Sequence, residues 1–534
     1  MRLRIPRLQT MHPSVARPTS RTAVLAAAAA LTLLATGQSA EAAGAATGLT
    51  KASHGDPYAA CTVGATPDSV LNPGAEVEPS VAVDQHHPGR IAGLWQQDRW
   101  NDGGSHGIAG TVSSDGGRTF TEITLPVSSC APGGLSYERA SDPWVSFGPD
   151  GTLYASALAF DANSPRNTVA ATTSADGGRT WHHTTALIDD TQLEFVDDKN
   201  SVTADPLRPG TAYQVWDRLD GGPTGLQLLT GPSLMSVTHD FGRTWSTPQV
   251  IVNTGQFQQT IGNVIVVDQH RGTLYDFYDS LTFTDADANT TTDVSYRMVR
   301  SDNGGRTWSQ PTVVATDTGT TDVDPNNGAA LRTGEGIPSV AIDPATGQLY
   351  LAYEGTDFTA GAYDQIQLTT STDGGRHWTS PARINGAPRS PAFTPSIAVT
   401  AAGTVAVTYY DIRTLRPGNT TTLPTSTWLT ESPRGGTHFT TERRIAPVFD
   451  FLSAPDAGGA FLGDYQGLAA VGNDVRALFI TANSNQPNNR TDAFTIQTPA
   501  LDPRTDGVAP GLAPAGPAPL ATGPAHPGRL SRRT

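Results

Sequence analysis

Short apolar runs recur along the chain, and glycine, proline or polar residues bound each of them. Near-continuous valine, isoleucine and alanine is typical of an inner strand that is covered on both faces. Seven such runs occupy equivalent places: 79–84, 142–147, 200–205, 262–267, 338–343, 395–400 and 467–472. After a turn, a second run follows and ends in large residues, as in Leu94-Trp95 and Tyr409-Tyr410. The pattern therefore predicts repeated pairs of neighbouring antiparallel strands.

An eight-residue phrase returns six times between these runs. It spans 113–120, 174–181, 238–245, 301–308, 371–378 and, in degenerate form, 432–439. The start-to-start intervals are 61, 64, 63, 70 and 61 residues, and such a period indicates a repeat architecture. A third strand leads into each phrase and a fourth leaves it. The sequence thus predicts an all-β fold, a β-propeller of four-stranded antiparallel blades.

The number of first strands favours seven blades, with six as the alternative if one unit is only a linking piece. The unit at about 464–498 lacks the phrase, and we expect the lead around 56–71 to supply its closing strand. The expected organisation is a signal peptide at 1–42, a lead at 43–74, the propeller at 75–498 and a disordered tail at 499–534. This tail is rich in proline, alanine and glycine and has few residues to bury.

The phrase has the pattern Ser/Thr-x-Asp-x-Gly-x-Thr-Trp, in which the aspartate accepts hydrogen bonds from nearby amides and closes a tight turn. Asn303 replaces this aspartate in the fourth copy and Arg434 in the sixth, which a turn-closing role tolerates better than a catalytic one. The phrase resembles the Asp-box, or BNR repeat, of the sialidase superfamily. The resemblance implies a propeller whose boxes lie opposite the active site. Because this box occurs in proteins of many functions, it indicates fold more strongly than activity.

The composition of the chain excludes some classes of binding partner and indicates the cellular compartment. A formal net charge of −15 argues against nucleic acid and anionic membranes as partners. Arginines precede an apolar run at 23–35, and Ala40 and Ala42 offer a cleavage site, so we expect secretion, with an uncleaved anchor as the alternative. Cys61 and Cys130 are the only cysteines. In an exported chain we expect them to form a disulfide, with two free thiols as the alternative.

Strand order places the residues that follow each second strand around one mouth of the propeller. Six of these are acids, with an asparagine in the seventh unit: Asp98, Asp161, Asp217, Asp279, Glu354, Asp411 and Asn483. Such a recurrent acid suits a turn-capping role. In three units an arginine follows, namely Arg99, Arg218 and Arg413. Three guanidinium groups at one mouth would bind a carboxylate, as the resemblance to sialidases also implies, whereas the alternative is pairing with neighbouring aspartates.

The residues just before each first strand include polar side chains that differ from one repeat unit to the next. They include Glu76, Glu78, Tyr137, Arg139, Asp142, Asp197 to Lys199, Glu335, and Phe461 to Gln466. The resemblance implies a tyrosine nucleophile beside a carboxylate. We expect Tyr465 in this role with Glu78 or Asp464, Asp98 or Asp142 as general acid, and Arg139 among the substrate-binding residues. A hydrogen-bonded Tyr465 that helps to close the ring is the alternative. The Phe-Arg-Ile-Pro motif of many sialidases is absent from the propeller start, so no catalytic residue is carried over by motif.

These patterns predict a secreted, monomeric, sialidase-like glycoside hydrolase that removes a terminal acidic sugar from a glycan or polysaccharide. The alternative is a non-catalytic propeller that binds a glycan or cell-surface polymer, and another polysaccharide-cleaving activity is a third possibility. We expect no nucleic acid partner, no membrane span, no metal site and no cofactor. Calcium is a weaker alternative at two acidic loops, 285–289 and 317–327.

Overall fold

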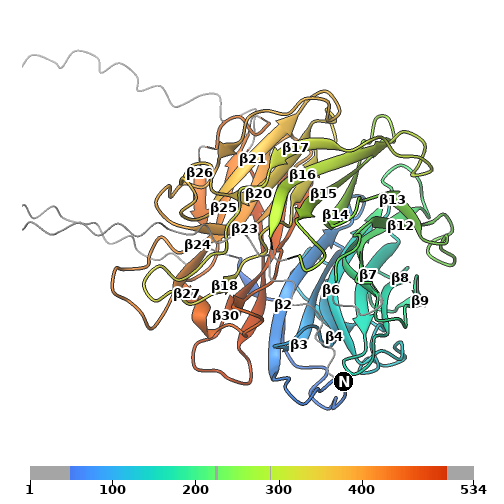
Figure 1. Ribbon diagram of the computed structural model, residues 1–534, viewed down its shortest axis with the longest axis horizontal. Helices are drawn as coiled ribbons and strands as arrows, with labels where there is room; N and C mark the ends of the chain where they lie inside the picture. The colour runs from blue at the N-terminus through green and yellow to red at the C-terminus, as the bar shows by residue number, and fades with distance from the viewer. Residues whose placement is uncertain (1–47, 223–226, 289, 434, 440, 502–534) are drawn as a thin grey trace, which may run out of the picture.

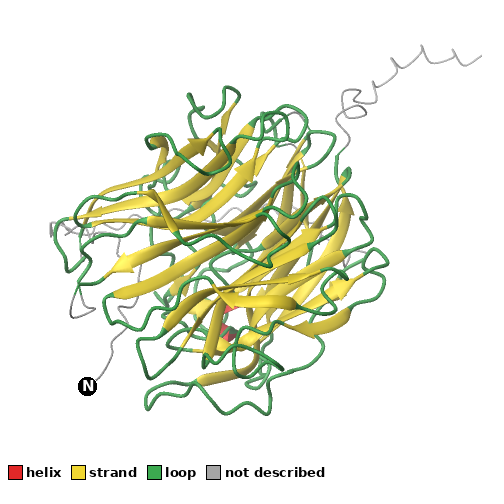
Figure 2. Cartoon of the chain, turned by 90° about the vertical axis from the view of Figure 1, so that its right-hand side faces the viewer, coloured by secondary structure: helices red, strands yellow, loops and turns green. Residues whose placement is uncertain are grey.

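A computed structural model describes residues 48–222, 227–288, 290–433, 435–439 and 441–501. The expected signal peptide and residues 502–534 of the expected tail lie outside this part of the chain. Strands dominate the described residues, and the single helical element there is a 3-10 turn, η1 (Phe451–Ser453) (Figure 2). No helix found in these ranges is long and apolar enough to cross a membrane.

The first half of the described chain forms four groups of four antiparallel strands. The first group holds β2 (Leu71–Val83), β3 (Ile91–Trp100), β4 (Ser105–Ser113) and β5 (Thr121–Thr124). The second holds β6 (Arg139–Phe147), β7 (Leu153–Phe160), β8 (Asn167–Ser174) and β9 (His182–Ala186), and a single pair, Ser105 with Ala140, joins it to the first. The third holds β10 (Phe195–Ala204), β11 (Ala212–Asp220), β12 (Ser233–Thr238) and β13 (Gln249–Val252). The fourth holds β14 (Gln258–Val267), β15 (Leu274–Phe283), β16 (Thr291–Ser301) and β17 (Thr312–Thr316).

The second half continues the same order. The fifth sheet holds β19 (Ser339–Ile342), β20 (Leu349–Gly355), β21 (Gln365–Ser371) and β22 (Ala382–Arg383). The sixth holds β23 (Ala392–Val399), β24 (Val405–Asp411), β25 (Pro424–Ser432) and β26 (Thr441–Arg444), and β27 (Phe449–Asp450) also pairs with β25. The seventh combines β29 (Gly467–Val471), β30 (Asp474–Ala482) and β31 (Thr491–Pro499) with β1 (Thr50–Lys51). Outside these sheets, β18 (Leu331–Arg332) pairs in parallel with β28 (Ala460–Phe461).

The sheets follow one another around the middle of the molecule. In Figure 1 the first strands β2, β6, β14 and β23 lie nearer the centre than β9, β13 and β26. β2 of the first sheet contacts β29, β30 and β31 of the seventh, so the two ends of the series meet. The all-β fold of four-stranded antiparallel sheets is therefore confirmed. If each sheet is one blade, the described residues hold seven, and the number of blades stays a prediction.

The N-terminal lead adds the last strand of the seventh sheet, but through a different segment from the one expected. Thr50 pairs with Thr495 and Lys51 with Phe494. The segment 56–71, expected in this role, makes turns instead, and its Tyr58 hydroxyl donates to the Ile108 carbonyl oxygen at 2.8 Å. Cys61 is bonded there to Cys130, which confirms the expected disulfide. Anchored in this way to the first sheet, the segment leaves the pairing with β31 to β1.

The Asp-boxes are turns that join the third and fourth strands of a sheet. In the second box, the Asp176 carboxylate accepts from the amides of Arg179 and Thr180 at 3.0 and 2.9 Å and from the Thr180 hydroxyl at 2.7 Å. In the fourth, Asn303 Oδ1 accepts from the Thr307 amide at 3.0 Å and keeps the turn closed. The box aromatic packs on the neighbouring sheet, as Trp378 does edge-on against Phe277. These contacts agree with a scaffold role.

The box hydrogen bonds lead to a first prediction. We expect Asp176→Ala to lower the free energy of unfolding by about 1 kcal/mol, because the turn loses four hydrogen bonds, one of them from the Ser174 hydroxyl, that water partly replaces. Asp176→Asn should cost less than half of that, since the amide oxygen of Asn303 already serves in the fourth box. Guanidinium unfolding of the two variants makes the comparison. Equal losses would show that the charge, rather than the acceptor, closes the turn.

Candidate functional site

Three inner strands each carry a bulge where the ladder shifts register. The shifts lie between Val77 and Ser80 in β2, between Ser141 and Trp144 in β6, and between Asp198 and Ser201 in β10. At each bulge a residue other than glycine adopts positive φ: Glu78 (55°), Asp142 (51°) and Lys199 (42°). Such bulges redirect side chains, and strained backbone of this kind clusters at functional sites. The repeated local structure thus turns three charged side chains out of the ladder.

Glu78 and Asp142 meet at the amine of Lys199, where a third acid, Asp464, joins them. Lys199 Nζ lies 3.4 Å from Glu78 Oε1, 3.1 Å from Asp142 Oδ2 and 2.6 Å from Asp464 Oδ2. Every one of these oxygens lies within 3.4 Å of the same nitrogen, so no two of them can be more than twice that distance apart. This upper limit falls inside the range of about 5 to 9.5 Å that separates the two carboxyl groups of glycosidases. The side chain of Lys199 is only 9% exposed. We call Glu78, Asp142, Lys199, Arg332 and Asp464 the central cluster.

Arg332, on the short strand β18, completes the central cluster. Its Nε and Nη2 donate to the two oxygens of Asp464 at 2.9 and 2.5 Å, a bidentate pair. The guanidinium carbon lies 4.5 Å from the centroid of the Phe461 ring, and that of Arg99 lies 5.2 Å from the same ring. The Arg332 side chain is 31% exposed, whereas Asp464 is 5% exposed. Arg332 is therefore the member of this pair that solvent reaches.

The pKa values of two acids in the central cluster are shifted in opposite directions. Burial, together with the charge of Asp142, raises the pKa of Glu78 to about 8. Burial also acts on Asp464, but Arg332 and Lys199 outweigh it and hold the pKa of that carboxyl well below its usual range. At neutral pH Glu78 is thus mainly protonated, and Asp464 is ionised. Two carboxyl groups held apart in this way can serve as acid and as charge stabiliser.

Tyr465 lies beside the central cluster, with its hydroxyl turned to the backbone. The hydroxyl donates to the Pro143 carbonyl oxygen at 3.2 Å, and the ring packs edge-on against Trp144 at 5.3 Å. Burial, followed by the charges of Glu78 and Asp142, raises the pKa of Tyr465 well above its ordinary value. Tyr465 lines a cavity of about 140 Å³ together with Asp142 and Lys199. The phenol therefore stays neutral in this arrangement.

Asp98 and Arg139 form hydrogen bonds and ion pairs near the N-terminal lead. Asp98 pairs with Nδ1 of His106 at 2.9 Å and accepts from the Gly74 amide at 2.7 Å. Arg139 donates to the Gly64 carbonyl oxygen at 2.7 Å and to Asp102 at 2.8 Å. These contacts join the lead to the first two sheets and include no member of the central cluster.

The contacts do not join Arg99, Arg218 and Arg413 to one another. Arg218 pairs with Asp190 and, across the β10–β11 ladder, with Asp197 at 3.1 Å. Arg413 pairs with Asp411 and, at 2.5 Å, with Glu442. Arg99 donates to Gln96 at 3.1 Å. Among the described contacts, Arg99 shares a neighbour with Arg332, through Phe461, and each of the three arginines has a partner of its own.

Sequence reasoning gave no role to the two cations of the central cluster, although Lys199 was among the lead-in residues. Lys199 carried a signal, because Lys51 and Lys199 are the only lysines of the chain. Arg332 carried none, since it lies in a long connection between β17 and β19 that no repeat covers. Glu78, Asp142, Asp464 and Tyr465 were expected at the strand lead-ins, and the structure brings these four together.

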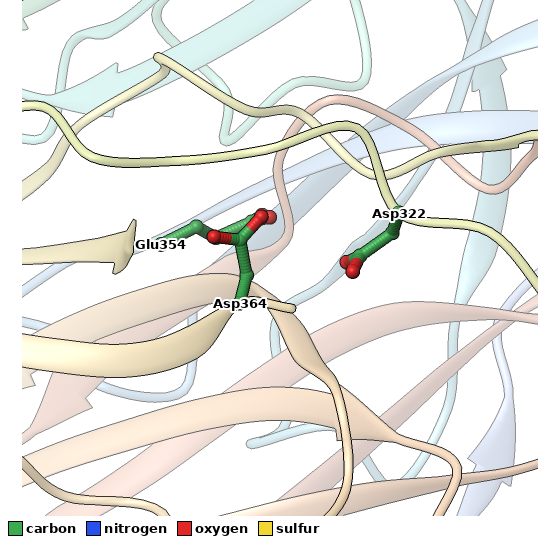
Figure 3. Close-up of side chains that lie close together, drawn as sticks. All are labelled: Asp322, Glu354 and Asp364. Atoms are coloured by element: carbon green, nitrogen blue, oxygen red, sulfur yellow. The ribbon is translucent and has the colours of Figure 1, made fainter. Parts of the chain in front are cut away.

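A second group of buried acids lies in the fifth sheet. Asp322 comes from the connection between β17 and β18, Glu354 from β20, and Asp364 directly precedes β21. Figure 3 shows their carboxylates turned toward one another, and one oxygen of each lies within 4.8 Å of the others. Glu354 accepts from the Thr394 amide at 2.7 Å, and Asp364 accepts from the Thr320 amide at 3.1 Å. Three carboxylates in this arrangement suit a hard divalent cation.

Comparison with known proteins finds similarity to a repeat domain and to a sialidase. A BNR repeat-like domain matches residues 283–445. A sialidase of Micromonospora viridifaciens is 33% identical over 178 residues, which are 30% of this chain and 25% of that protein. The match therefore spans a quarter of the length of this relative.

Two solved structures give loose superpositions. The alpha-L-arabinanase of Penicillium chrysogenum complexed with arabinobiose has a TM-score of 0.40 and 15% identity over 70% of this chain and 96% of that one. The Hadza microbial sialidase Hz136 has a TM-score of 0.42 and 15% identity over 77% of this chain and 76% of that one. Superpositions this loose add nothing to the fold described above. Over the stretches matched in sequence, the chain is similar to a BNR repeat-like domain and to a sialidase, in agreement with its repeated Asp-boxes.

Proposed function

We propose that this protein is an exported glycoside hydrolase of the sialidase type, which removes a terminal acidic sugar at the central cluster. One observation carries the proposal: carboxylates from three separate segments meet at one buried amine, and two of them have pKa values shifted in opposite directions. The superfamily and its sialidase relative support the reaction class. The disulfide supports export, because disulfides persist in oxidising compartments.

In the proposed reaction Glu78 acts as the general acid. It gives its proton to the glycosidic oxygen as the bond from that oxygen to the sugar breaks. The ionised Asp464, together with Asp142, faces the positive charge that develops on the sugar, and a water molecule adds to the sugar carbon and returns a proton to Glu78. Tyr465 remains the candidate nucleophile, but its hydroxyl would first have to leave the Pro143 carbonyl oxygen and pass its proton to a carboxylate. Arg332 is the residue that would pair with the carboxylate of the sugar.

A non-catalytic glycan-binding propeller is the second candidate, and the size of the cavity favours it. The cavity holds about 140 Å³, whereas pockets for small ligands hold roughly 300 to 1,000 Å³. A sugar would therefore bind above the cavity, at the exposed edge of Arg332, rather than inside it. Binding at that edge requires no movement of the buried acids.

Turnover of defined substrates separates the two candidates. The purified protein is expected to cleave fluorogenic sialosides faster than a panel of neutral glycosides, because Arg332 recognises an anion. Arg332→Lys should raise KM for sialosides roughly tenfold or more, since a lysine cannot form the bidentate contact. Arg297→Lys is the matched control: Arg297 pairs with Asp293 at 2.7 Å, and its side chain is 26% exposed. Absence of turnover with every substrate, combined with binding to a sialylated glycan, would replace the hydrolase with the binding candidate.

A further inference from the structure

The fifth sheet holds four buried carboxyl groups without a basic partner. Asp322 and Glu354 are each 2% exposed, Asp364 is 0% and Glu335 is 6%. Among the described residues, no lysine, arginine or histidine forms an ion pair with any of the four, and the nearby Arg332 is engaged with Asp464. Burial of several like charges without a counter-charge is costly. These acids therefore need a cation or protons that the side chains around them do not supply.

Two of these acids also have an oxygen without a hydrogen-bond partner. Asp322 Oδ2 has none, and in Figure 3 this carboxylate faces Glu354 and Asp364. Glu335 Oε2 has none either. Burial, followed by the charge of Asp322, raises the pKa of Glu335 well above its usual range. Buried polar atoms are nearly always satisfied, so the open acceptor of Asp322, turned toward Glu354 and Asp364, points to a missing partner.

The spacing of the oxygens suits calcium. Ca²⁺ binds oxygen ligands at about 2.3 to 2.6 Å, so ligands on opposite sides of one ion lie up to about 5 Å apart. The oxygens of Asp322, Glu354 and Asp364 lie within 4.8 Å of one another. Mg²⁺ prefers shorter bonds and retains several waters, for which a site closed by protein carboxylates is less suited.

We propose that Asp322, Glu354 and Asp364, with Glu335 as an additional ligand, bind one Ca²⁺ ion in the fifth sheet. The ion would fix the connection between β17 and β19 on the ends of β20 and β21. That connection also carries Arg332, and the adjacent Thr333 hydroxyl donates to Glu354 at 3.2 Å. The calcium site would thereby position the segment that delivers Arg332 to the central cluster.

Metal content and thermal unfolding test the site directly. The full chain, equilibrated with CaCl2 and then desalted, is expected to retain about one Ca²⁺ per molecule by elemental analysis. Excess CaCl2 should raise Tm by about 3 °C or more relative to EGTA, because a ligand that binds only the folded state stabilises it. A wild-type protein that holds no calcium and has the same Tm in CaCl2 and EGTA would overturn the proposal.

Variants test whether these residues are the ligands. Asp322→Asn should abolish the retained Ca²⁺ and the Tm response, and Glu354→Gln provides the same test at a second position. Asp68→Asn, at an exposed position of the N-terminal lead outside both acidic loops, is the control and should leave both unchanged. Full calcium retention in the Asp322 and Glu354 variants would overturn the assignment. These readouts do not depend on glycoside cleavage, so failure of the calcium site and failure of the proposed hydrolase are separate results.

Discussion

Replacing Glu78 with glutamine is expected to lower kcat by about 100- to 10,000-fold at pH 6, because the amide cannot give a proton to the leaving group. Glutamine preserves the shape of the side chain and its contact with Gln96, so the fold should persist. The loss should be smaller for substrates with good aryl leaving groups, which need less help from an acid. Steady-state kinetics on both kinds of substrate measure the difference.

The pH dependence of kcat provides a second, independent test of Glu78 as the general acid. Its pKa is about 8, and the acid works only while protonated, so wild-type kcat should fall as pH rises through 8. Glu442→Gln is the matched control, because Glu442 pairs with Arg413 in the sixth sheet, away from the central cluster. A Glu78 variant as active as the Glu442 variant with natural linkages would remove Glu78 from the mechanism.

Replacing Lys199 with methionine is expected to lower the free energy of unfolding by about 3 to 5 kcal/mol at pH 7, the cost of leaving buried charges without their partner. Lys199 is the common partner of Glu78, Asp142 and Asp464. Removal of its charge leaves three acids close together, with Arg332 paired to only one of them. Guanidinium unfolding of the variant and the wild type measures the loss.

The chain offers a matched control in its other lysine. Lys51 pairs with Asp492 at 2.6 Å, but its side chain is 39% exposed. Lys51→Met should therefore cost less than about 1 kcal/mol, as is usual for an exposed ion pair. Similar losses in the two variants would mean that water reaches the central cluster freely, and its unusual pKa values would then have no basis.

The strand pattern predicted most of the fold because each unit repeats the same local signals. All seven expected first strands overlap an observed one, from β2 to β29. Five of them, β2, β6, β10, β14 and β23, begin earlier than expected, since pairing continues beyond a bulge that the apolar pattern does not reveal. The same bulges explain why the lead-in residues Glu78 and Asp142 were better candidates than acids at the ends of second strands.

The arginines show where sequence reasoning fails. Arg218 stands directly across the ladder from Asp197, and Arg413 is two residues from Asp411, so local partners satisfy both. The direction of a long side chain depends on such neighbours, which the order of strands does not specify. Arg332 reaches the central cluster from a two-residue parallel strand, a feature without periodicity. Its partner Asp464 was expected as a site residue, but only the folded chain shows that this carboxylate pairs with Arg332.

The pairing of β1 with β31 has a consequence for biosynthesis. The strand that completes the seventh sheet leaves the ribosome long before its partner, because most of the described chain lies between them. Until β31 emerges, β1 has no partner, and its backbone groups are open to any other chain, a known hazard of unpaired strand edges. The nascent polypeptide therefore carries an unpaired strand until its two distant segments meet.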